Sequence, residues 1–132
     1  MNYLIQEKVP ILDEHILKRK SGEVIAEVNE EYLQKIVEKC NKRIDDTGDK
    51  IPLVIGHTQE GLSEKDQPEI IGYASELCVG PLYNTGRKAI LAKFEIMADK
   101  KEKANQHPRR SVELWLDDDK IDPISLLGAT TS

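Results

Sequence analysis

The sequence predicts an α+β domain in which a small, mostly antiparallel β-barrel or curled sheet is flanked by helices. Short stretches of alternating apolar residues outnumber the helical stretches, and the two kinds of element neither alternate strictly nor form repeats. A chain of 132 residues can bury about two-thirds of its unfolded surface, so no disulfide or metal is needed to hold it. We therefore expect residues 1–132 to form a single domain.

The first part of the chain is expected to hold short strands and one long helix. Residues 1–28 mix apolar alternation with charged turns, which indicates one or two strands. Asn29 suits an N-cap, and the glutamates after it suit the positive end of a helix dipole. A helix over residues 30–45 is predicted because its apolar residues recur on one stripe: Leu33, Ile36, Val37, Cys40 and Ile44.

Three further strands are expected in the middle of the chain. Residues 51–57, IPLVIGH, are almost wholly apolar, as in strands that are covered on both faces, and residues 58–68 are typical of a polar loop. The next two strands are joined by the turn-like segment GPLYNTGRK. Their apolar faces are expected to be Ile71, Tyr73, Leu77 and Val79 in one strand, and Ile90, Ala92, Phe94 and Ile96 in the other.

The last part of the chain predicts a helix and two strands. The helix over residues 98–106 should end before Pro108, because the residue preceding a proline is disfavoured in the helical region. The segment RRSVELWL then alternates between an apolar face of Val112, Leu114 and Leu116 and an opposite face of Ser111, Glu113 and Trp115. The three aspartates at 117–119 suit a solvated turn before a final strand.

Composition disfavours several classes of function. Hydrophobic residues make up 39% of the chain, and no apolar run approaches the roughly 20 residues of a membrane span. A net charge of −5 disfavours nucleic acid as a partner. The N-terminus lacks the features of a secretory signal, which favours residence in a cytoplasm. Cys40 and Cys78 are expected to be buried free thiols, and no metal or cofactor is predicted.

Two residues stand out as candidates for chemistry. His57 follows a buried strand and precedes a flexible loop, a position where a rigid element delivers a side chain to a cleft. An imidazole with a pKa near 6.5 can accept the proton of a serine nucleophile, and Ser111 is presented by a strand. His15 and His107, in contrast, suit surface or structural roles. From the residues alone, a structural role for Ser111 and His57 is the simpler interpretation.

The ordered series IGHT, IIGYASEL, ILAKFEI, RRSVELWL and ISLLGATT resembles the head-maturation (prohead) proteases of tailed phages, particularly the Mu-type branch. These proteases are distant relatives of the herpesvirus assemblins. The resemblance runs from about residue 51 to residue 131, and it lies in the order and spacing of the segments. It implies an assemblin-like fold and a serine protease activity.

The resemblance also assigns residues. It makes His57 the general base and Ser111 the nucleophile. Assemblins use a second histidine located after the serine as the third member, whereas this chain has no histidine beyond His107. If there is a triad, a carboxylate must therefore complete it, with Asp122 as the first choice and Glu113 as the second. The backbone amides of Leu127 and Gly128, with Ala129, are the expected donors to an oxyanion.

These implications describe a hydrolase of virion assembly. The expected substrates are phage scaffold and major capsid proteins and the protease itself, inside the assembling procapsid in the host cytoplasm. A dimer or higher self-association is expected by analogy, with no nucleic acid or membrane partner. The chain would be the N-terminal part of a longer protein with a scaffold-like extension. Two alternatives are a non-catalytic capsid-assembly or scaffold-interacting module and a hydrolase that uses His57 with carboxylates on a metal.

Overall fold

The computed structural model describes residues 2–56 and 69–128. The strands in this part of the chain are β1 (Tyr3–Asp13), β2 (His15–Lys18), β3 (Val24–Val28), β4 (Ile51–Ile55), β5 (Ile70–Pro81), β6 (Lys88–Met97), β7 (Arg109–Trp115) and β8 (Lys120–Leu127). The helices are α1 (Glu30–Thr47), the short 3-10 helix η2 (Ala98–Lys100) and α2 (Lys101–Gln106).

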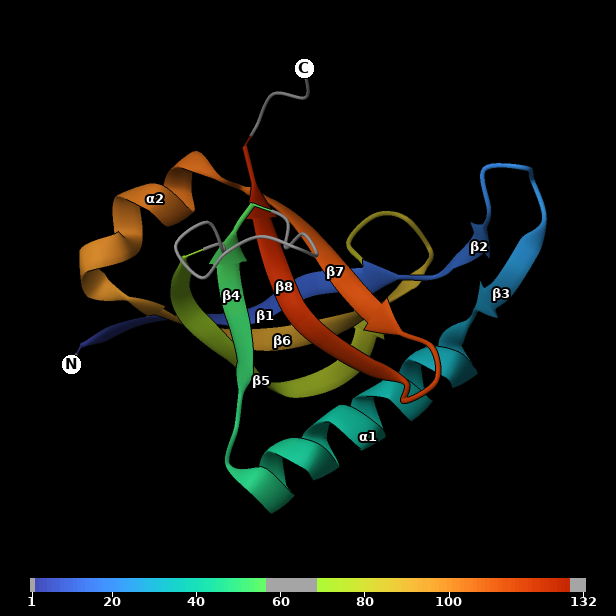
Figure 1. The fold of residues 1–132 in the computed structure, drawn as a ribbon, viewed down its shortest axis with the longest axis horizontal. Coiled ribbons are helices and arrows are strands. Elements are labelled where there is room, and N and C mark those ends of the chain that lie inside the picture. Colours follow the sequence, from blue (N-terminus) through green and yellow to red (C-terminus); the bar gives the residue numbers. More distant parts are fainter. Residues whose placement is uncertain (1, 57–68, 129–132) are drawn as a thin grey trace, which may run out of the picture.

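The main sheet of the described residues has six strands in the order β1-β6-β5-β4-β8-β7. Its pairs are antiparallel except for β4 and β8, which run parallel. The sheet curls into a half-barrel, so that its two end strands approach each other (Figure 1). At that seam the Arg110 Nε donates a hydrogen bond of 2.9 Å to the Pro10 carbonyl oxygen. The predicted α+β class and curled, mostly antiparallel sheet are confirmed.

Helix α1 lies below the half-barrel and closes its core (Figure 1). Asn29 caps it as predicted, because its Oδ1 accepts a hydrogen bond of 2.9 Å from the Tyr32 backbone N–H. The helix ends at Gly48, whose φ of 77° permits the left-handed cap and a hydrogen bond to the Ile44 carbonyl. The buried part of its predicted stripe packs against the sheet in one core: Leu33, Ile36, Val37 and Cys40 from the helix, with strand residues such as Leu53, Phe94 and Ile124.

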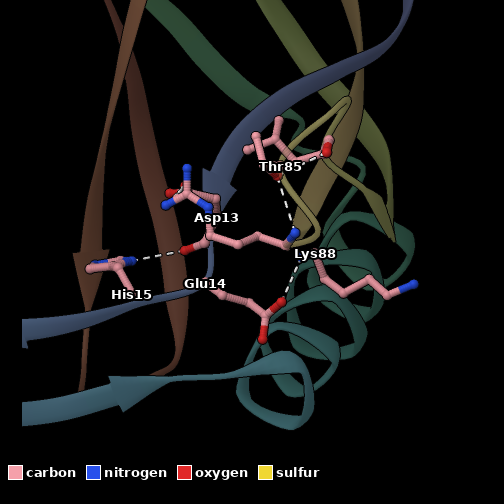
Figure 2. A network of polar contacts seen from close by, with 7 residues as sticks. Asp13, Glu14, His15, Thr85 and Lys88 are labelled. Carbon is pink, nitrogen blue, oxygen red and sulfur yellow. Dashed lines mark hydrogen bonds and ion pairs between the residues drawn. The ribbon is translucent and has the colours of Figure 1, made fainter.

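The first 28 residues form three strands, where one or two were predicted. The long β1 joins the main sheet, whereas β2 and β3 form a separate two-stranded hairpin that projects from it (Figure 1). Figure 2 shows the corner between β1 and this hairpin, where the Glu14 carboxylate accepts a hydrogen bond from the Lys88 backbone N–H. The Asp13 carboxylate also pairs with Arg87. These contacts fix the base of the hairpin to the start of β6.

The predicted apolar alternation of β5 is wrong at one position. Tyr73 does not belong to the core, whereas Ala74 does, and the strand is irregular between Ser75 and Cys78. Glu76 adopts a φ of 50° inside this irregularity. A bulge shifts the side-chain alternation by one residue, so a single period of two cannot describe the whole strand. The apolar face predicted for β6 is confirmed in full, since all four of its residues are buried.

No helix in the described part of the chain is both long enough and apolar enough to cross a membrane.

Candidate functional site

Ser111 lies on the outer face of the half-barrel, in the end strand β7. Its neighbour Val112 packs against the core together with Leu114, so Ser111 and Glu113 project from the opposite face. Leu116 does not share the anchoring role predicted for it, because it follows the end of β7 and is 39% exposed. Ser111 itself is partly buried. The strand that carries it is fixed through Val112 and Leu114 on its other face.

Directly across from Ser111 lies a second serine. Ser111 and Ser125 are register partners in the antiparallel β7–β8 pair, and Ser125 is also the register partner of Val54 in β4. The three side chains therefore form a row across one face of the sheet. Ser125 and Val54 are buried, with exposed fractions of 0% and 4%, although both lie on the face opposite to the core.

His57, the predicted general base, lies outside the described residues. The described part of the chain stops just before it at Gly56, which has a φ of 80° and whose backbone N–H donates to the Leu126 carbonyl at 3.0 Å. This bond holds the exit of β4 beside the end of β8. The pairing of Ser111 with His57 thus stays a prediction.

Asp122 is not brought to Ser111. It lies three residues before Ser125 in β8, which corresponds to roughly 10 Å along a strand. It lines a small cavity near the C-terminal end of α1, together with Arg43 and Lys50. Its backbone carbonyl accepts a hydrogen bond of 2.9 Å from Trp115 Nε1. Asp122, the first choice for a third catalytic member, therefore lies in a different part of the molecule from Ser111, the candidate nucleophile.

The other predicted site residues lie nearer to Ser111. Glu113 is partly buried and shares its face two residues further along β7, so the two side chains project in parallel. Leu127 pairs with Arg109 at the end of β8, and Gly128 follows it. The proposed oxyanion donors are thus two to three residues beyond Ser125, while Ala129 lies outside the described residues.

The three aspartates after β7 do not form a uniform solvated turn. Asp117 and Asp118 are exposed, but Asp119 is buried. Its carboxylate accepts a hydrogen bond of 2.9 Å from Lys39 Nζ and one of 3.1 Å from Tyr32 Oη.

These contacts, with Lys35 Nζ at 3.2 Å, fasten the β7–β8 turn to α1. The hydrogen bond from Lys39 is the main cause that lowers the pKa of Asp119, and the contacts with Lys35 and Tyr32 act in the same direction. A sequence signal for this cluster exists in retrospect, because two lysines four residues apart share one face of a helix.

The remaining histidines have structural contacts. His15 Nδ1 lies 2.8 Å from the Asp13 carbonyl oxygen, as Figure 2 shows, and His107 Nδ1 lies 2.7 Å from the Lys103 carbonyl oxygen. Because a carbonyl oxygen can only accept, each Nδ1 carries a proton and donates it. Both rings are therefore oriented by their own local backbone.

The two cysteines differ from each other. Cys40 is buried in the core as predicted, and burial raises the pKa of its thiol. Cys78 is only partly buried, which contradicts the prediction, and its Sγ lies 3.4 Å from Lys8 Nζ.

Comparison of the chain with protein-family models, with curated proteins and with solved structures gives no significant match. Membership of the phage protease family thus stays a prediction that rests on the residue pattern.

Proposed function

We propose that this protein is a serine endopeptidase that cleaves scaffold and capsid proteins, and itself, during the maturation of a phage head. Ser111 is the nucleophile and His57 the general base. The observation that supports this most is the setting of Ser111: a partly buried hydroxyl on a strand that is anchored through Val112 and Leu114, beside a second, fully buried hydroxyl. A rigid support of this kind is what a nucleophile requires.

In the proposed reaction the Ser111 hydroxyl gives its proton to His57 while Ser111 Oγ forms a bond to the peptide carbonyl carbon. The imidazolium then protonates the leaving amine as the peptide bond breaks, and water releases the acyl group in a second cycle. Backbone amides at Leu127 and Gly128 are the proposed donors to the oxyanion.

A fluorophosphonate probe tests this proposal, because it labels a serine only when its hydroxyl is activated. We expect one label per chain, located at Ser111 by peptide mapping and lost in Ser111→Ala. Peptide cleavage by that variant should fall by roughly 10⁴-fold or more, because removing one member of a catalytic unit costs about as much activity as removing all of them. Ser21→Ala, at an exposed serine of the β2–β3 turn, is the matched control and should keep both activities.

A non-catalytic capsid-assembly or scaffold-interacting module is the second candidate. The observation in its favour is that Asp122, the first choice for the third member, lies about three residues along β8 from the register partner of Ser111, which leaves Glu113 as the remaining predicted carboxylate. A folded protein whose Ser111 resists the probe would support this candidate and contradict the protease.

A further inference from the structure

Ser125 carries a buried hydroxyl that no contact within the described residues explains. Its Oγ is the single buried side-chain polar atom there that lacks a hydrogen-bond partner, and its exposed fraction is 0%. Leaving a buried hydroxyl unpaired destabilises a fold, and an alanine at the same place would avoid that cost. An unpaired group of this kind in a native structure calls for a reason other than stability.

The register of the sheet gives Ser125 one polar neighbour. Of its two partners in the adjoining strands, Val54 offers only methyl groups, whereas Ser111 offers an oxygen. Side chains directly opposite each other in an antiparallel pair have Cβ atoms about 4.5–5.5 Å apart. Two hydroxyls on such atoms come within hydrogen-bond distance when one of them turns about χ1, and rotamers of a partly exposed side chain such as Ser111 exchange rapidly.

We infer that Ser125 is a positioning residue for Ser111: its hydroxyl donates a hydrogen bond to Ser111 Oγ as that oxygen loses its proton. The inference rests on the proposed protease function. Ser125 keeps its own proton and forms no covalent bond, since the proton of Ser111 goes to the base. A donor in a buried site stabilises a developing negative charge more than water would, because the effective dielectric constant there is lower.

This role differs from that of a third triad member. A carboxylate such as Asp122 would act on the base, whereas Ser125 acts on the nucleophile directly from the neighbouring strand. The position is also protected from solvent, so bulk water does not compete for the donor. A pair of serines facing each other across β7 and β8 would thus act on the nucleophile itself, whichever carboxylate orients the base.

The test compares the rate of fluorophosphonate labelling in wild type, Ser125→Ala, Ser125→Thr and Ser125→Val. We expect Ser125→Ala to lower the maximal labelling rate about 10- to 100-fold, with the probe concentration for half-maximal rate unchanged and the melting temperature equal or higher. Thr and Val have nearly the same shape, and only Thr keeps the hydroxyl. Ser125→Thr should therefore label faster than Ser125→Val, even if the fold tolerates the larger side chain poorly in both variants.

The possible results separate this inference from the proposed function. If Ser125→Ala labels at the wild-type rate while Ser111→Ala remains unlabelled, the role of Ser125 is overturned and the protease proposal stands. If all Ser125 variants label more slowly only in proportion to lost folded protein, or if Thr and Val behave alike, the hydroxyl has no part in activation. If wild type is not labelled at Ser111, both proposals fail together.

Discussion

The side chain of Asn41 in α1 provides both hydrogen bonds that the backbone of Leu77 needs inside the β5 bulge. Its Nδ2 donates to the Leu77 carbonyl at 2.8 Å, and its Oδ1 accepts from the Leu77 N–H at 3.0 Å. The bulge interrupts the pairing with β6, so the amide replaces the missing strand partner. One helix side chain therefore stabilises an irregular strand that local sequence rules do not anticipate.

Replacing this amide should destabilise the protein markedly. Asn41→Ala leaves both backbone groups of Leu77 without their partner, and we expect a loss of about 2–4 kcal/mol in the free energy of unfolding. Asn41→Asp keeps the acceptor but sets a carboxylate against the Leu77 carbonyl, so it should also destabilise. Urea unfolding followed by circular dichroism measures both. Gln34→Ala, at an exposed amide of the same helix, should change the midpoint little.

Asp119 should contribute to stability through its charge. Asp119→Asn preserves the shape of the side chain and tolerates the φ of 49°, but it removes the ion pairs with Lys35 and Lys39. Both lysine side chains are about half exposed, so their charges return to water and the loss should be about 1–2 kcal/mol. The exposed Asp117→Asn is the control. Equal unfolding midpoints for the two variants would contradict this role.

The same carboxylate predicts a dependence of stability on acid. The pKa of Asp119 in the folded protein is lowered below its ordinary value of 3.8, so the unfolded chain binds the proton more readily. Its contribution is complete above the unfolded pKa and is lost as the pH falls through the folded pKa.

The difference in unfolding free energy between wild type and Asp119→Asn should therefore be constant from about pH 7 to pH 5 and shrink below pH 4. Glu69 is a useful comparison, because hydrogen bonds from Lys100 and Lys103 lower its pKa to about 2 while it remains exposed. A difference that grows as the pH falls would show that Asp119 is not the stabilising anion described.

Gly72 should be intolerant of any side chain. A Cβ at this position would lie 2.3 Å from the Glu95 carbonyl oxygen, which belongs to the backbone of the paired strand β6. Gly72→Ala must therefore displace one strand, and we expect a loss of about 1–3 kcal/mol. Gly80→Ala is the matched control in the same strand, because its Cβ would meet only the side chain of Leu91, whose Cδ1 can turn away. Thermal melts of the two variants should differ clearly.

The elements that the sequence predicts well are those governed by one regular period. The stripe of α1, its Asn29 cap and the buried face of β6 follow from local spacing and are confirmed. The bulge in β5 and the burial of Asp119 depend on partners 36 and 80 residues away, which no local window contains.

The candidate site shows the same limit. Sequence placed Ser111 on the face opposite to Val112, as the structure does, but the choice of Asp122 followed from chain order alone. The structure gives a different neighbour, Ser125, through the register of two strands. The register of this hairpin depends on its turn and on an irregularity between Val112 and Leu114, which the apolar alternation does not reveal, so a serine in an apolar stretch gave no sign of its importance.

The seam of the half-barrel has a consequence for motion. Within the described residues β7 is paired with β8 on one side only, and the Arg110–Pro10 hydrogen bond joins it to β1 on the other. Amide hydrogens on the outer edge of β7 should thus exchange with solvent deuterium sooner than those of β5 and β6, which are paired on both sides. β7, which carries Ser111, is thus one of the two end strands of the sheet, and a single ladder together with the Arg110–Pro10 hydrogen bond holds it in place.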